Sequence, residues 1–190
     1  MANKVKFGLK NVHYAKITYG AGGSITYATP VVFPGAVNLS LDPQGDTTDF
    51  YADDGLYYTG AANVGYKGTF EAALVPDGFK TTILGDVVDS NGLLIEQTDK
   101  QTEHFALLFE IDGDVKARRV VLYDCTVTRT AVASKTKTNS TAPITETMTI
   151  TVVPTKDGYV KGQTTDTTST ADYKNWYNAV KEPSIPAVTT

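Results

Sequence analysis

Cysteine is almost missing from this chain, since Cys125 is the only one among 190 residues. A single thiol excludes an intramolecular disulfide, and the alternating run around Cys125 predicts a buried side chain that does not react. The N-terminal residues lack the apolar run of a signal peptide, and no stretch approaches the roughly 18 apolar residues of a membrane span. We therefore expect a chain that is made in a cytoplasm and does not enter a membrane.

Histidine is scarce as well, with only His13 and His104, and each lies within a predicted strand. The sequence contains no nucleophile elbow, no zinc-protease motif, no local Cys/His signature and no phosphate-binding loop. Carboxylates are densest between Asp42 and Asp54, but their spacing lacks the glycine and glutamate that a calcium-binding EF-hand loop requires. We therefore expect no catalytic residues, no metal site and no cofactor.

Positive charge is outnumbered, because the chain has a net charge of −4 and a pI of about 5.1. An acidic protein is repelled at long range by nucleic acids and by anionic membranes, so general binding to either is excluded. At 20.4 kDa the chain fits a single domain. A domain of this size buries roughly 70% of the surface of its unfolded chain, which is enough for a core without disulfides.

Apolar and polar residues alternate with a period of two through most of the sequence, which is typical of half-buried strands. The alternation and the turn residues between the runs predict strands over residues 12–19, 35–41, 62–75, 103–111, 115–130 and 143–153. Asp112 and Gly113 indicate a tight type I′ hairpin turn. The fold class is therefore mainly β, a sandwich or barrel formed by residues 1–153.

Residues 42–60 are dense in aspartate, glycine, threonine and tyrosine, and we expect them to form a long loop. Loops of this length are uncommon in compact domains unless they bind something. We predict inter-subunit contacts by six residues here: Asp46, Asp49, Tyr51, Asp53, Tyr57 and Tyr58. A basic cluster elsewhere could meet this acidic segment in another copy of the chain, and it consists of Arg118, Arg119, Arg129, Lys135 and Lys137.

Two short helices are expected beside the strands. Asp77 can cap a helix that buries Phe79, Ile83 and Leu84 and ends at Gly85. Ser169 and Asp172 have capping-box spacing and begin a second helix, which Pro183 ends. Its aromatic stripe contains Tyr173, Trp176 and Tyr177, and a polar linker over 155–170 separates it from the β body. We therefore treat 154–190 as a linker and an arm that can reach either its own sandwich or a neighbouring subunit, and we predict that its three aromatic residues contact a neighbour.

Several blocks in order along the chain carry a resemblance to a known family. They are KVKFGLKNVHYA (4–15), PGAVNLSLDPQGDTTDFYADDGLYY (34–58), GYKGTFEAALVPDGFKTTILG (65–85), DSNGLLIE (89–96), HFALLFEIDGDVKARRVVLYDCTVTR (104–129) and YKNWYNAV (173–180). With these blocks the chain resembles the major tail proteins, or tail tube proteins, of long non-contractile-tailed phages (siphophages) of Gram-positive bacteria. The likeness spans nearly the whole sequence.

The resemblance implies a β-sandwich flanked by a short helix, whose copies form stacked hexameric rings. The rings would make a hollow tube in the virion, in contact with the tape measure protein and other tail proteins, through which DNA passes without specific binding. Strand alternation makes Lys67, Thr69 and Glu71 candidates for the lumen wall. The alternative is a carbohydrate- or surface-binding β-sandwich module that uses Tyr51, Tyr57 and Tyr58 as its platform.

Overall fold

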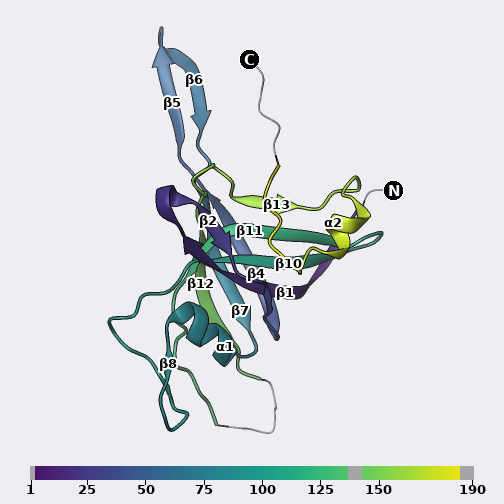
Figure 1. Ribbon diagram of the computed structural model, residues 1–190. Helices are drawn as coiled ribbons and strands as arrows, with labels where there is room; N and C mark the ends of the chain where they lie inside the picture. The colour runs from purple at the N-terminus through teal and green to yellow at the C-terminus, as the bar shows by residue number, and fades with distance from the viewer. Residues whose placement is uncertain (1–2, 137–142, 185–190) are drawn as a thin grey trace.

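The structure is a computed structural model that describes residues 3–136 and 143–184. The prediction of a mainly β fold is confirmed (Figure 1). The strands that form the body are β1 (Lys6–Tyr19), β2 (Ile25–Tyr27), β3 (Val31–Val32), β4 (Ala36–Gln44), β7 (Gly65–Ala72), β10 (Phe105–Gly113), β11 (Arg118–Val127), β12 (Glu146–Val152) and β13 (Lys161–Gln163). Two further pairs stand apart from the body: β5 (Thr47–Ala52) with β6 (Gly55–Ala61), and β8 (Val87–Val88) with β9 (Leu94–Ile95).

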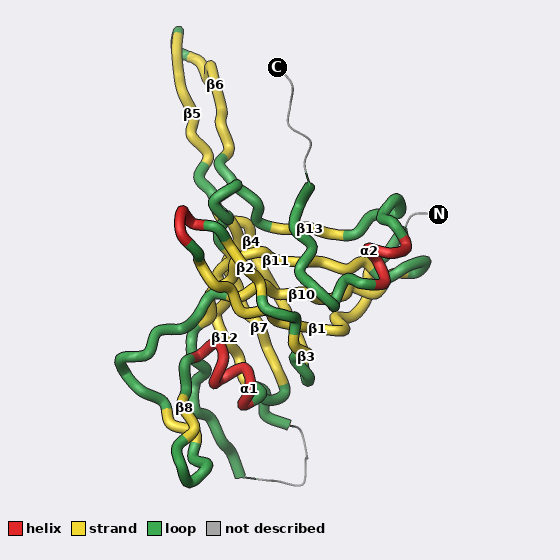
Figure 2. The backbone as a smooth tube through the Cα atoms, viewed as in Figure 1, coloured by secondary structure: helices red, strands yellow, loops and turns green. Residues whose placement is uncertain are grey.

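The body is one nine-stranded antiparallel sheet folded into two layers. Seven strands follow the order β2-β1-β10-β11-β12-β7-β4, while β3 pairs with β1 and β13 pairs with β11. Strand β11 belongs to both layers. Its first half pairs with β10 and β13, and its last residues, Cys125 to Val127, pair with β12. Strands β1, β10 and β11 cross β7 and β12 steeply (Figures 1 and 2), as in sandwiches whose corner strands pass from one layer to the other.

The main core lies between the two layers. Phe105, Leu107 and Leu122 from one layer meet Phe70 and Ile150 from the other, and all five are almost fully buried. Cys125 is completely buried here, and this burial raises the pKa of its thiol. The buried residues alternate with exposed ones along β7 and β12, which is the pattern on which the strand prediction depended.

Several predicted boundaries differ from the structure. The strand expected over 62–75 is shorter, because β7 covers only Gly65–Ala72 and leaves Val64 and Leu74 exposed. The tight turn expected at Asp112 and Gly113 is wrong, since both residues still belong to β10 and the connection to β11 follows them. Gly113 is favoured for another reason: a Cβ atom there would lie 2.8 Å from the backbone oxygen of Lys116.

The first helix forms where it was expected, but Asp77 does not cap it. The α1 helix (Asp77–Phe79) continues into a π-helical turn over Lys80–Leu84, and the N-cap residue is Pro76. The Pro76 carbonyl accepts hydrogen bonds from the amides of Phe79 and Lys80, at 2.9 and 3.1 Å. Gly85 ends the helix in the left-handed conformation, at a φ of 80°, as predicted. Phe79, Ile83 and Leu84 are buried, which ties this helix to the core.

The segment 155–170, which we expected to be a polar linker, adds a strand to the body. Strand β13 pairs with Val120, Val121 and Leu122 of β11. The Thr164 amide also donates to the Arg119 carbonyl at 2.8 Å, which extends the pairing by one residue. The polar composition did not indicate this strand, because β13 is held by backbone hydrogen bonds to β11 and its own side chains stay outside the core. Strand pairing therefore crosses the boundary expected at 153.

The close approach of β4 to β7 depends on Gly68. A Cβ atom on Gly68 would lie 1.9 Å from the backbone oxygen of Ser40, so the two strands would have to move apart. We expect Gly68→Ala to reduce the free energy of unfolding by about 1–3 kcal/mol, as overpacking does. Gly8→Ala in β1 is the matched control, because nothing lies within 4 Å of its Cβ position. Urea denaturation measures both variants, and equal stabilities would contradict the prediction.

Candidate assembly surfaces

Strands β5 and β6 form a β-hairpin that projects away from the body (Figure 1). The expectation of a long loop over 42–60 is therefore wrong for most of this segment. The turn is made by Asp53 and Asp54, both with positive φ (50° and 59°), as a two-residue hairpin turn requires. Aspartate tolerates this conformation better than most residues, and the threonines and aromatics beside it favour strands.

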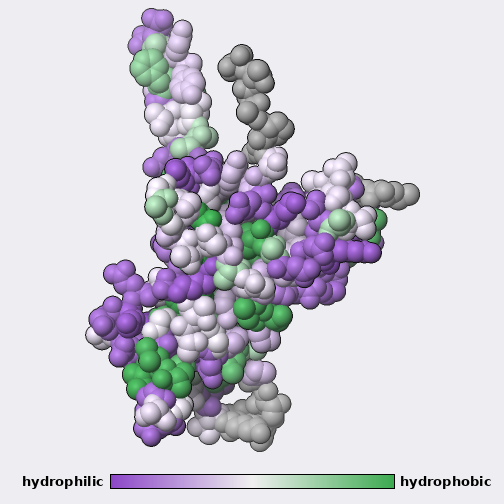
Figure 3. All heavy atoms as spheres, in the orientation of Figure 1, coloured by the Kyte–Doolittle hydropathy of each residue, from purple (hydrophilic) through white to green (hydrophobic). Residues whose placement is uncertain are grey.

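The hairpin carries large side chains that nothing in the described chain covers. Five of them are exposed: Phe50, Tyr51, Leu56, Tyr57 and Tyr58. Tyr57 has 73% of its surface exposed. Figure 3 shows hydrophobic and hydrophilic residues mixed along the hairpin. Sequence reasoning missed Phe50 and Leu56 as exposed members of this segment.

The hairpin presents aromatic rings on both of its faces. Phe50 is paired with Tyr58 across the strands, so these two side chains lie on one face, with the Tyr57 ring 6.4 Å from that of Phe50. Tyr51 follows Phe50 directly and is paired with Leu56, so it points to the other face. Tyr51, Tyr57 and Tyr58 therefore do not form one flat platform of the kind a sugar ring would stack on.

Lys67, Thr69 and Glu71 lie together on a polar sheet face formed by β4, β7 and β12. Each has polar cross-strand neighbours: Asp42 and Thr151 beside Lys67, Ser40 and Thr149 beside Thr69, and Asn38 and Thr147 beside Glu71. Lys67 and Thr69 are exposed. Glu71 is half-buried, and its Oε1 accepts a hydrogen bond from the Thr145 hydroxyl at 2.5 Å. Most apolar residues of these strands point to the opposite face, toward the core, and Val37 is an exposed exception.

One edge of this polar face is open. Strand β4 pairs with β7 on one side and ends the strand order, so within the described residues its other edge has no strand partner. An uncovered edge of this length is a template for pairing with another chain. The arrangement can therefore extend the polar face from one copy to the next.

The C-terminal aromatic segment packs on its own chain. The α2 helix covers only Thr170–Lys174, and Ser169 caps it by accepting a hydrogen bond from the Asp172 amide at 3.0 Å. The capping prediction is confirmed, but the helix ends well before Pro183. Trp176 and Tyr177 follow it and contact Leu108, Val121 and Tyr123 on the outer side of the sheet.

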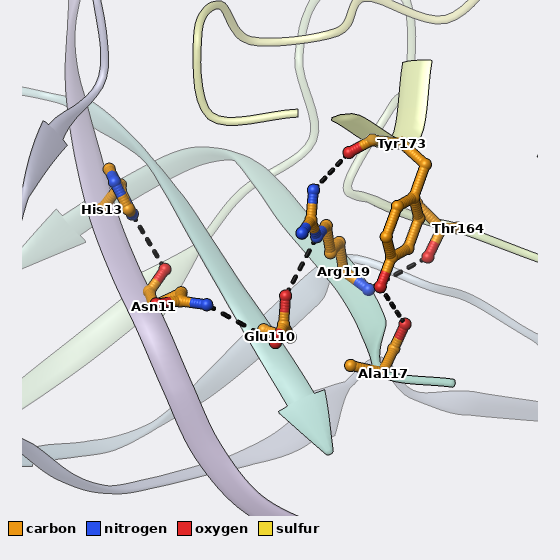
Figure 4. A network of polar contacts seen from close by, with 7 residues as sticks. All are labelled: Asn11, His13, Glu110, Ala117, Arg119, Thr164 and Tyr173. Atoms are coloured by element: carbon orange, nitrogen blue, oxygen red, sulfur yellow. Dashed lines mark hydrogen bonds and ion pairs between the residues drawn. The ribbon is translucent and has the colours of Figure 1, made fainter. Parts of the chain in front are cut away.

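Arg119 connects this segment to the sheet (Figure 4). Its Nε donates to Glu110 at 2.9 Å, one of its terminal nitrogens donates to the Tyr173 carbonyl, and its guanidinium lies 4.0 Å from the Tyr173 ring centre. The Tyr173 hydroxyl donates to the Ala117 carbonyl at 2.9 Å. Tyr177 stacks on His13 at 4.4 Å, and burial raises the pKa of its phenol.

Tyr173, Trp176 and Tyr177 therefore do not lie on a free arm of the single chain, and their contact with a neighbouring subunit stays a prediction. Trp176 is only 6% exposed, so it is part of this chain's own second core. Two members of the predicted basic cluster form ion pairs within the chain: Arg119 with Glu110, and Arg129 with Asp86 and Glu96. Lys137 lies outside the described residues.

His104 lies in a polar cluster at the start of β10. Its Nδ1 lies 2.6 Å from Asp124 Oδ1 and 2.8 Å from the Tyr19 hydroxyl, which itself donates to Asp124 Oδ2 at 2.6 Å. Both contacts use the same ring nitrogen, so the imidazole does not bridge a hydroxyl and a carboxylate through its two nitrogens, as a catalytic triad requires. The cluster instead joins the ends of β1, β10 and β11.

Over residues 3–136 and 143–184, no group of three or more His, Cys, Asp or Glu side chains is arranged to hold a metal ion. No helix in these ranges is both long and apolar enough to cross a membrane.

No protein-family model matches this chain, and no curated protein is similar to it. Among solved structures, the chain is similar to the tube-terminating cap of the anti-feeding prophage, determined by cryo-electron microscopy. The two chains share 13% identity with a TM-score of 0.46, and the match covers 87% of this chain and 95% of that chain.

Proposed function

We propose that this protein is a structural subunit of a phage tail, which polymerises into stacked, hexameric rings that form the tail tube. The observation that carries the proposal is the projecting hairpin, because five large exposed side chains on a two-stranded ribbon need a partner. An isolated two-stranded hairpin is marginally stable in water, whereas burial of its aromatic rings in a contact stabilises it strongly. The resemblance of the sequence to major tail proteins favours the same function.

The polar sheet face of β4, β7 and β12 supports a role as the inner wall of the tube. Its described charges are Asp42, Lys67 and Glu71, so one lysine faces two carboxylates. A wall of threonines with a slight negative balance neutralises few phosphates, and DNA therefore slides along it without binding. Pairing along the free β4 edge would join the faces of neighbouring copies into a closed barrel, which leaves no exposed sheet edge.

In this proposal the protein is a component of the virion, assembled after synthesis in the host cytoplasm. Its partners are further copies of itself, the tape measure protein that the tube encloses, and other tail proteins at the ends of the tube. No catalytic step is needed for this role, and no cofactor.

Negative-stain electron microscopy of the purified, concentrated protein tests the proposal. Rings or hollow tubes of uniform diameter are the expected result. A protein that stays monomeric at millimolar concentration and binds a glycan column would contradict it and would favour the carbohydrate-binding alternative instead.

The lumen assignment is tested by adding positive charge at Thr69, the central exposed residue of the polar face. Thr69→Lys is expected to leave tubes intact but to make them bind DNA. Each additional phosphate contact steepens the salt dependence of log K by about 0.9 for duplex DNA, so retention should disappear at high salt. Gln101→Lys adds the same charge at an exposed position outside β4, β7 and β12 and is the matched control. Equal DNA retention by the two variants would place Thr69 outside the lumen.

A further inference from the structure

An apolar groove opens between the first half of β1 and the first half of β4. Its floor is formed by the edge of the core, including Leu39, Leu41, Phe109 and Leu122, and its volume is about 530 Å³. A second hollow of about 660 Å³ continues it. The two share five lining residues: Lys6, Ile111, Val120, Lys161 and Gln163. Volumes of this size are typical of pockets that bury a ligand or a side-chain cluster.

Apolar side chains also stand exposed around this groove. Phe7 lines it and is 61% exposed, and Val37 lines it from β4 and is exposed as well. Val5, which lines the second hollow, is also exposed. These residues extend the apolar floor onto the rim. The surface is therefore suited to a partner that brings aromatic or aliphatic side chains.

The rim is cationic. Four basic residues line the groove or its continuation: Lys4, Lys6, Arg118 and Lys161. No carboxylate of the described chain lies within salt-bridge distance of any of them, and the nearby Asp112 is paired with Lys10. The Lys161 amine lies 4.9 Å from the centre of the Tyr66 ring and donates to the Tyr66 hydroxyl at 3.2 Å. On an acidic protein, such a concentration of positive charge selects an acidic partner.

The β5–β6 hairpin has the complementary properties. It combines the five large exposed side chains described above with three aspartates, at positions 49, 53 and 54, and Asp46 directly precedes it. The hairpin of the same chain leaves from the far end of β4 and projects away from the body (Figure 1). We propose that the groove between β1 and β4 receives the β5–β6 hairpin of a second copy of this chain.

This inference rests on the proposed function and specifies its contact. The hairpin and the groove are different surfaces of one molecule, so each copy offers a free hairpin and a free groove after it has bound a neighbour. A contact of this head-to-tail type propagates into a ring or a filament, whereas a contact between two identical surfaces stops at a dimer. Tyrosines at the centre of such a contact carry a large share of its affinity.

Charge reversal with rescue tests the pairing. Lys6→Glu with Arg118→Glu in the groove, and Asp46→Lys with Asp49→Lys in the hairpin, are each expected to raise the concentration needed for assembly by at least about tenfold. Neither aspartate has a positive φ, so lysine fits the backbone at both positions. Combining the two pairs in one chain restores the opposite charges and should restore assembly. Lys100→Glu with Lys174→Glu, at two exposed lysines elsewhere, is the matched control.

A second measurement does not depend on tube formation. A benzoylphenylalanine photo-crosslinker at position 57 of the full chain should link copies, and the linked peptides should map to residues 4–9, 36–41 and 161–163. Tubes with links that map elsewhere would overturn the groove assignment and leave the proposed function standing. Links in the groove without rings or tubes would support the groove and contradict the tube. The absence of any link between copies would contradict the groove.

Discussion

A chain that lacks the hairpin is expected to fold normally and to remain monomeric at concentrations at which the intact protein polymerises. The deletion removes residues 47–61 and joins Asp46 to Ala62. These two residues already lie side by side, because the Ala62 amide donates to the Asp46 carbonyl at 3.1 Å. All strand pairing of β5 and β6 is internal to the hairpin, so the body loses no ladder. The melting temperature should change by less than about 2 °C, as for changes at exposed sites.

Single substitutions distinguish the loss of the hairpin contact from other effects of the deletion. Tyr57→Ala should weaken polymerisation by roughly tenfold or more, since interface tyrosines are frequent hot spots. Val132 is a fully exposed apolar residue outside the hairpin, with 105% relative exposure, and Val132→Ala should have no effect on polymerisation. Sedimentation velocity measures polymerisation and differential scanning calorimetry measures the melting temperature. Polymerisation of the deletion variant at the normal concentration would show that the hairpin is not an assembly contact.

The strands of the body were predictable because their periodicity has a direct physical cause. Met148, Ile150 and Val152 face the core, while Thr149 and Thr151 between them do not, and this alternation is visible in the sequence. The same pattern correctly placed Lys67 and Thr69 on the exposed face of β7. The sequence does not indicate which exposed faces contact another chain, because a solvated face and a polar interface have the same sequence pattern.

The hairpin was missed for a reason specific to its residues. Both of its faces are exposed, so β5 and β6 have no buried side to impose alternation, and an aspartate pair is a weaker turn signal than Asn-Gly. The basic groove was missed because its residues come from distant segments. Lys6, Arg118 and Lys161 are brought together only by the pairing of β1 with β10, β10 with β11, and β11 with β13.

The C-terminal segment shows which part of a helical pattern is reliable. The spacing of Tyr173, Trp176 and Tyr177 correctly indicated side chains that need burial, but not the length of the helix nor the surface that buries them. That surface is the outer side of β10 and β11, where Leu108 and Val121 point away from the main core. Two-sided burial of these strands appears in the sequence as the continuous apolar runs FALLF and VVLY, which is the signal that could have identified the site.

Trp176→Ala is therefore expected to destabilise the single chain. Removal of a buried tryptophan typically costs about 3–5 kcal/mol, which for a chain of this size lowers the melting temperature by roughly 6–20 °C. Trp176→Phe is the matched control: the Nε1 has no acceptor within the described residues, so phenylalanine keeps most of the apolar contact and loses no hydrogen bond. Its loss of stability should be less than half that of the alanine variant. Calorimetry of the monomer at low concentration measures both. If Trp176→Ala instead melts like the intact protein but fails to polymerise, the aromatic segment docks on a neighbouring copy and the intrachain packing is wrong.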